Sequence, residues 1–400
     1  MKYSHISVAI PMLTELENLP RLFDTLKHQS LSDFSVYCCI NNREGWASSG
    51  NEIEQAMYQN NQASLEYLKS LQQTTLNFQL NILDYSSIGK GWNGKQKGVG
   101  WARKILFDAI AAQCNGNELI VSLDADTSVS NKYLESVLCT MNSYPDHSAL
   151  CVPYYHPLIG NQQYDRAMLR YEIYMRHYLI SLLESNNPYA FTALGSAMVF
   201  PLWAYKRVGG ITPLQGGEDF YLMQKFAKTG KLLLSCNEIV NPQGRPSSRV
   251  PFGTGPAIAK GIDSMDSTYP LYPFEGFKAV ADTYAMFPRL YDEDIETPMS
   301  EFLRQQLKTD DLWQPLRKNF KTRELFIHAC TERVDGLRIL QFLKTFPLRP
   351  AEEELLLFCK HHRISIPANF SFRESFIESL NVARDAFFEL ECSLRKRIIF

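Results

Sequence analysis

The sequence predicts an α/β protein: a mixed, mostly parallel sheet flanked by helices, followed by a helical C-terminal region. The apolar run at residues 119–123 ends in Asp124 and Asp126, as a buried parallel strand does when polar side chains follow at its carboxyl edge. Strand-like runs alternate with helical patterns over the first 240 residues. From about residue 277 the apolar spacing is helical to the end.

The first 40 residues predict a βαβ unit. Residues 6–11 form an apolar run ended by Pro11, which is typical of a strand. Residues 15–28 place five apolar side chains on one side of a helix. Residues 34–40 are again strand-like and are closed by Asn41 and Asn42. Because βαβ crossovers are right-handed, these strands are expected to lie side by side and parallel.

The same reasoning extends along the chain. Further strands are expected at residues 80–83, 119–123, 149–153, 195–200 and 232–235, and further helices at 52–71, 100–112, 133–142, 164–183, 203–208 and 218–230. Residues 241–276 are dense in proline and glycine, which is typical of a functional loop, and we interpret them as a lid. The expected organisation is a catalytic domain at 1–255, a linker or lid at 256–276, and a helical region at 277–400.

Composition limits the classes of protein and partner. The chain has 400 residues, of which 45% are hydrophobic and 21% charged, as in soluble globular proteins. A net charge of −2 gives no electrostatic case for nucleic acid. Nine scattered cysteines without a CxxC pattern indicate a reducing compartment, so a cytoplasmic protein is expected.

Membrane and zinc signals are weak. The N-terminal residues lack a signal-peptide h-region, and no apolar stretch reaches the roughly 18 residues of a membrane span. Peripheral contact with the inner face of a membrane stays open, although the basic and then apolar residues 395–400 are interpreted as a frayed, solvated end. His361 and His362 are interpreted as a solvated loop pair rather than a zinc site.

Three segments carry the chemistry. Asp124 and Asp126 offer hard oxygen ligands to Mg²⁺ or Mn²⁺, with phosphate oxygens completing the shell, unless the strand simply ends in a solvated turn. The Gly- and Lys-rich loop at 89–98 is either a phosphate cradle or a surface turn. Glu218 and Asp219 begin a helix, where the macrodipole alone favours carboxylates.

Taken in order, these motifs resemble the family-two glycosyltransferases of the GT-A fold, over about residues 5–250. The matching motifs are Pro11 to Glu15 for P-x-x-N-E, Gly98 to Lys104 for G-x-S-x-A-R-N, Asp124 and Asp126 for DxD, and Gly209-Gly210 followed by Glu218-Asp219. Two positions depart from the family pattern. Thr14 stands where the family has Asn, and Asn41-Asn42 stand where it has an Asp pair.

The resemblance implies a metal-dependent, hexosyltransferase-like enzyme that moves a sugar from a nucleoside-diphosphate donor to a hydroxyl acceptor with inversion. It implies Mn²⁺ or Mg²⁺ held at Asp124 and Asp126, with Asp219 as the general base and Glu218 as the alternative base. The expected donor-binding residues are Pro11, Glu15, Asn41, Lys95, Gly98, Arg103, Asp124, Arg245 and Arg249. Lys95 and the three arginines are included because ammonium and guanidinium groups suit diphosphate oxygens.

Several specificities stay open. A UDP-sugar is the default donor, but Asn41 leaves the base undecided because an amide both accepts and donates hydrogen bonds. The acceptor is a glycan, a lipid-linked molecule or a small molecule. Two alternatives remain: a catalytically silent GT-A-like binding or scaffold protein, and a sugar nucleotidyltransferase. The second is disfavoured because residues 13–18 are acidic where such an enzyme carries a basic, glycine-rich loop.

Overall fold

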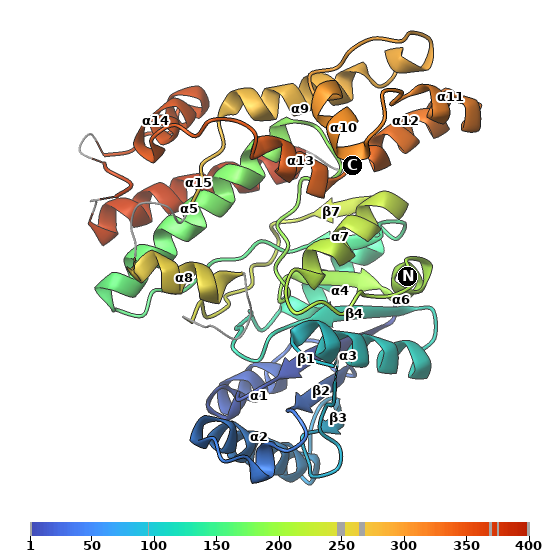
Figure 1. Cartoon of the computed structure of the whole chain (residues 1–400). Helices are drawn as coiled ribbons and strands as arrows, with labels where there is room; N and C mark the ends of the chain where they lie inside the picture. The colour runs from blue at the N-terminus through green and yellow to red at the C-terminus, as the bar shows by residue number, and fades with distance from the viewer. Residues whose placement is uncertain are drawn as a thin grey trace. The chain divides into compact units, whose positions relative to one another are not determined.

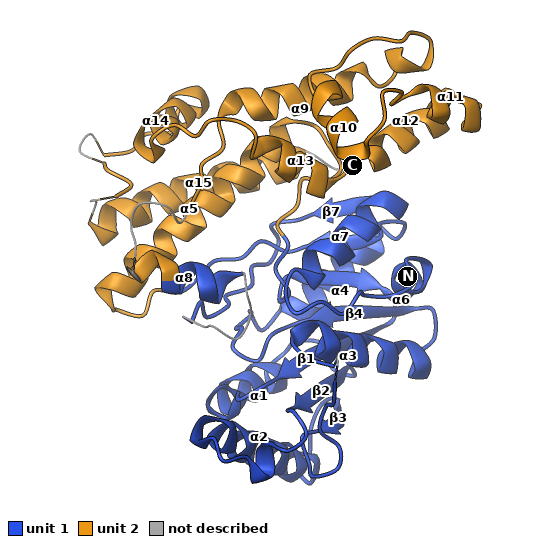
Figure 2. Cartoon of the chain, viewed as in Figure 1, with its two compact units in different colours: residues 1–157, 193–259 blue, residues 158–192, 260–400 orange. Residues whose placement is uncertain are grey.

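The chain divides into two compact units (Figure 2). The structure is a computed structural model that describes residues 2–94, 96–245, 253–263, 269–367, 370–373 and 376–397. Unit 1 comprises residues 1–157 and 193–259, and unit 2 comprises residues 158–192 and 260–400. The units therefore interleave along the sequence, whereas the expected domains were continuous segments.

Unit 1 is built on a seven-stranded sheet in the order β3-β2-β1-β4-β6-β5-β7. Its strands are β1 (His5–Met12), β2 (Ser35–Asn41), β3 (Gln79–Tyr85), β4 (Glu118–Ser122), β5 (Ala149–Cys151), β6 (Met198–Pro201) and β7 (Leu232–Leu234). The strands from β3 to β4 are parallel, as are β5 and β7, while β6 runs antiparallel to both of its neighbours. The predicted fold class, a mixed and mostly parallel sheet, is confirmed.

Helices cover this sheet (Figure 1). They are α1 (Leu19–Lys27), α2 (Glu52–Gln72), α3 (Val99–Gln113), α4 (Tyr133–Ser143), α6 (Leu202–Arg207) and α7 (Glu218–Thr229), with the 3-10 turns η1 (Leu16–Asn18) and η2 (Trp46–Ser48). Right-handed crossovers place α1 and α2 on one face of β1 to β3, and α3, which returns from β3 to β4, on the other. The strand order therefore reverses between β1 and β4, and α/β sheets bind ligands at the carboxyl ends of such a pair.

Unit 2 is helical, as predicted for the C-terminal region. Its helices are α5 (Gln162–Glu184), α9 (Phe274–Met286), α10 (Ser300–Leu307), α11 (Gln314–Asn319), α12 (Arg323–Arg333), α13 (Gly336–Leu343), α14 (Ala351–His362) and α15 (Ile377–Arg397), with the 3-10 turn η3 (Arg289–Tyr291). α5 and α15 pack side by side, and the fully buried Arg176 joins them through ion pairs with Glu172 and Glu391. Among the residues described, no helix is both long and apolar enough to cross a membrane.

The Pro- and Gly-rich segment is not a continuous loop, because α8 (Thr254–Asp263) forms within it. Pro256 is its third residue, where the missing amide hydrogen has no partner inside the helix. Residues 246–252 and 264–268 of the predicted lid lie outside the described residues, so the lid stays a prediction. The apolar end of the predicted basic tail, residues 398–400, is also outside them.

Candidate active site

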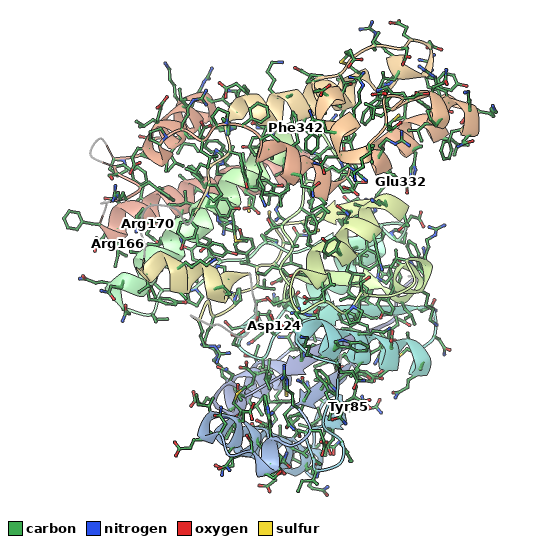
Figure 3. The ribbon with its side chains drawn as sticks, in the orientation of Figure 1. Tyr85, Asp124, Arg166, Arg170, Glu332 and Phe342 are labelled. Atoms are coloured by element: carbon green, nitrogen blue, oxygen red, sulfur yellow. The ribbon has the colours of Figure 1, made fainter. Side chains whose placement is uncertain are left out.

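The two aspartates follow directly on β4, at the strand-order reversal. The backbone N–H of Leu123 donates to the carbonyl of Ala9 over 3.1 Å, which keeps the chain beside β1 for one residue beyond β4. A turn then follows, in which the N–H of Thr127 donates to the carbonyl of Asp124 over 3.0 Å. Figure 3 labels Asp124 and also Tyr85, the last residue of β3. The two carboxylates thus stand at the carboxyl edge of the sheet, as the sequence predicted.

Arg103 of α3 connects the aspartates to α7. Its Nη2 lies 2.6 Å from Oδ1 of Asp124, and its Nη1 donates to Oε1 of Glu218. The residue is only 3% exposed. Burial works against its charge, yet the carboxylates of Asp124 and Glu218 raise its pKa above the ordinary value. One guanidinium therefore holds together carboxylates from two distant parts of the chain.

Glycines allow this close approach. A Cβ on Gly100 would lie 2.1 Å from the carbonyl oxygen of Leu214, and one on Gly98, which has φ of +79°, would lie 3.1 Å from Cα of Gln215. The start of α3 therefore packs against the backbone that leads into α7. A Cβ on Gly195 would lie 1.9 Å from Nη2 of Arg103, so only glycine fits over the guanidinium. Sequence reasoning placed Gly195 at the start of a strand and missed this role.

A second guanidinium spans the reversal itself. Nη2 of Arg245 lies 2.7 Å from Oε2 of Glu15, which follows β1, and 3.0 Å from Oδ2 of Asp126, which follows β4. The bridge between Ser128 and Asn241 runs the chain after β7 alongside the aspartate turn, and this brings Arg245 within reach. In this structure Arg245 and Arg103, both predicted diphosphate partners, bind carboxylates.

Burial makes the site electrostatically unusual. It raises the pKa of Asp126 to about 6, an effect to which nearby Asp124 adds. Burial also raises the pKa values of Glu218 and Asp219, while Arg103 opposes the rise. Asp219 lies near enough to Asp124 for the charge of Asp124 to raise its pKa further. One oxygen of Asp219 accepts the N–H of Phe220 over 2.8 Å.

The remaining predicted residues lie around this edge. Pro11 lies within β1, opposite Cys39 of β2, and the buried Asn41 is the last residue of β2. Lys95 and Arg249 lie outside the described residues.

Asn61 of α2 was missed altogether. It is fully buried, and it donates to the carbonyl of Asn41 over 3.0 Å and accepts the N–H of Thr14 over 2.9 Å. It thereby ties the ends of β1 and β2 together. Nothing in its polar sequence neighbourhood distinguished it.

The donor set fits a divalent cation. Glu15, Asp124, Asp126, Glu218 and Asp219 carry five carboxylates, and Arg103 and Arg245 supply two guanidiniums. Three formal negative charges are left that these arginines do not balance. Carboxylate oxygens are the ligands that Mg²⁺ and Mn²⁺ prefer, and a cation would offset both the burial of Asp126 and the nearby charge of Asp124, which together raise the pKa of Asp126.

No protein-family model matches the chain, and no curated protein matches it. Among solved structures, it is similar to S. aureus TarS 1–349 in complex with UDP-GlcNAc, at 11% identity and a TM-score of 0.41, covering 96% of this chain and 92% of that one.

A mannosyltransferase from Pyrobaculum calidifontis, in complex with GDP-Man and Mn²⁺, gives 10% identity and a TM-score of 0.41, covering 96% and 85%. The structure of GalNAc-T7 with UDP, GalNAc and Mn²⁺ is similar at 13% identity and a TM-score of 0.36, and the match covers 77% of this chain and 55% of that one. The function of this chain has to be inferred from its own site residues.

Proposed function

We propose that this protein is a glycosyltransferase that moves a sugar from a nucleoside-diphosphate donor to a hydroxyl acceptor with inversion, using Mn²⁺ or Mg²⁺. The observation that carries the proposal is the convergence of Asp124, Glu218 and Asp219 around Arg103, with Asp126 on the same turn. Carboxylates for a cation and a carboxylate for proton removal thus meet at the reversal of strand order, where ligands bind such sheets.

The reaction needs a group that stabilises the departing diphosphate and a base that removes the proton of the acceptor hydroxyl, and different carboxylates of the site suit each need. Bound at Asp124 and Asp126, a divalent cation would neutralise the negative charge that develops on the departing diphosphate. Glu15 and Arg245, which flank the same turn, would contact the donor, and their contacts with each other and with Asp126 support this role. Asn41, at the end of the neighbouring strand β2, stays the candidate for contact with the base, with a UDP-sugar as the default.

Asp219 is our candidate for the general base. Glu218 is only 2% exposed and is bound to Arg103, so it serves to position α7 and the guanidinium. Asp219 is only partly buried, and burial raises its pKa, which makes its carboxylate a better proton acceptor. The acceptor oxygen would attack the anomeric carbon as the bond to the diphosphate breaks. The hydroxyl proton would pass to Asp219, and the anomeric centre would be inverted.

The variant Asp219→Asn tests the proposal. The amide cannot take the proton, so we expect turnover to fall by about 10²–10⁴-fold while donor binding is kept. Nucleoside-diphosphate release is measured with a panel of nucleotide sugars, acceptors and Mn²⁺, and donor binding by calorimetry. Asp146→Asn is the matched control, because the side chain of Asp146 is 93% exposed.

Three results would count against parts of the proposal. Full turnover by Asp219→Asn would remove Asp219 from the role of base. Donor binding by the wild type without any turnover, across all acceptors, would favour a silent binding protein. Failure of every nucleoside diphosphate to bind in the presence of Mn²⁺ would overturn the function itself.

A further inference from the structure

Two histidines and a glutamate meet in unit 2, where two helices end. α5 ends at Glu184, and α14 ends with His361 and His362. The interpretation of the histidines as a loop pair was wrong, because both belong to the last turn of α14. Nε2 of His362 lies 3.5 Å from Oε2 of Glu184, and Nε2 of His361 lies 3.9 Å from Oε1. All three ligand atoms lie within 4.8 Å of one another.

The two separations between an imidazole nitrogen and a carboxylate oxygen are close to those that one tetrahedral ion imposes. Zinc binds imidazole nitrogen and carboxylate oxygen at about 2.0–2.1 Å, so neighbouring ligands of a tetrahedral ion are about 3.3 Å apart. The pair at 3.5 Å already meets this spacing, and the pair at 3.9 Å needs a movement of only about half an ångström. His361 is half exposed, so an ion can reach the cluster from solvent.

The electrostatics of the cluster favour a cation. The negative ends of two helix macrodipoles, those of α5 and α14, come together here. The carboxylate of Glu184 lies at the same place, and the side chain of His362 beside it is only 7% exposed.

We propose that Glu184, His361 and His362 form a Zn²⁺ site that fastens the end of α14 to the end of α5 within unit 2. Two imidazoles and one carboxylate are a set that zinc takes, and three protein ligands leave a fourth position to water. The site lies in a different unit from the carboxylates of the proposed catalytic centre. It would therefore act on the stability of unit 2, whether or not the proposed activity is correct.

The test is zinc binding by the untagged full-length chain. Competition with a chromogenic chelator gives stoichiometry and affinity, and thermal unfolding with and without Zn²⁺ gives the shift in melting temperature. The variants are Glu184→Gln and His361→Gln. The matched control is His328→Gln, because Nδ1 of His328 lies 3.9 Å from Glu332 in a pair without a second imidazole. Cys139→Ser controls for the exposed thiol.

We expect one zinc ion to bind at this cluster and the melting temperature to rise. Loss of an outer-shell partner already costs 10–100-fold in metal affinity, so loss of a ligand in Glu184→Gln or His361→Gln should cost at least about 100-fold. The thermal shift should vanish with it, and His328→Gln and Cys139→Ser should keep both the affinity and the thermal shift. Absence of zinc binding by the wild type, or unchanged affinity in both ligand variants, would overturn the proposal.

Discussion

The variant Asp126→Asn is expected to be more stable than the wild type at pH 7 and nearly as stable as the wild type at pH 4, in the absence of divalent metal. The side chain of Asp126 is 16% exposed, and burial beside Asp124 raises its pKa from 3.8 to about 6. Between these pH values the folded state binds the proton more tightly than the unfolded state does. Wild-type stability therefore falls as the pH rises through this window, and the cost is complete above pH 6.

The magnitude follows from that rise of about two pKa units. At 1.36 kcal/mol per unit, ionised Asp126 costs the folded wild type about 3 kcal/mol at pH 7. The asparagine side chain would avoid this cost, and the pKa of about 6 already includes the attraction of Arg245 for the ionised carboxylate. The variant should therefore be about 3 kcal/mol more stable than the wild type at pH 7 and within about 0.5 kcal/mol of it at pH 4.

Urea unfolding in EDTA at half-unit steps from pH 4 to 8 measures this difference. Other groups with raised pKa values, such as Glu218, affect both proteins alike and cancel in the comparison. Asp146→Asn, at an exposed ion pair with Lys2, should stay within about 0.5 kcal/mol of the wild type throughout. A stability difference between Asp126→Asn and the wild type that does not change with pH would refute the reasoning.

Manganese adds a second readout on the same pair of proteins. An ion that binds only the folded state stabilises it by about 2.7 kcal/mol at 100 times its dissociation constant. If Asp124 and Asp126 hold the ion, Mn²⁺ should stabilise the wild type and leave Asp126→Asn nearly unchanged, so the advantage of the variant at pH 7 should disappear. Equal stabilisation of both proteins by Mn²⁺ would place the metal elsewhere.

Two further substitutions test the backbone of the site. Thr14 has φ of +58°, which is strained for a β-branched residue, so Thr14→Asn should raise the free energy of unfolding by about 1 kcal/mol in urea titrations. A loss of stability there would contradict the strain. Gly195→Ala forces Arg103 away from its carboxylates, so it should lower the free energy of unfolding by about 3 kcal/mol in the same measurement. Gly116→Ala is the control and should be nearly neutral, because a Cβ there would have nothing within 4 Å. Equal effects of the two substitutions would exclude the close approach of Gly195 to Arg103.

The sheet could be predicted because its signals are local. The run that became β4 is apolar on both faces, and every residue of β4 is indeed buried. The pairing of α5 with α15 could not be predicted, because apolar spacing marks a helix as packed without naming the surface it packs on. α5 is thus adjacent in sequence to β5 and β6 but belongs to unit 2, where Arg176 meets Glu391 more than 200 residues further on.

The carboxylates of the site could also be predicted from local sequence, because Asp124 and Asp126 follow a strand and Glu218 and Asp219 begin a helix. Their arrangement relative to one another could not be predicted in this way. It depends on the glycines that let the start of α3 touch Leu214, and on Asn61, which ties two strand ends from a helix that follows both. Such contacts join positions whose own neighbourhoods carry no distinguishing pattern.

The roles of Arg103 and Arg245 could not be predicted from residue type alone. A guanidinium binds carboxylate and phosphate oxygens by the same paired hydrogen bonds, so its presence in a motif does not tell which anion it binds.

Burial distinguishes the arginine that binds carboxylates permanently from the one that can bind a phosphate. Arg103 is 3% exposed and has given both Nη atoms to carboxylates, so for it to bind a diphosphate would leave Glu218 buried without its partner. The side chain of Arg245 is 37% exposed and contacts Asp126 at 3.0 Å, so it can exchange a carboxylate for a phosphate oxygen at far lower cost. Of the predicted diphosphate partners that the structure describes, Arg245 is therefore the ligand candidate, and Arg103 is a positioning residue.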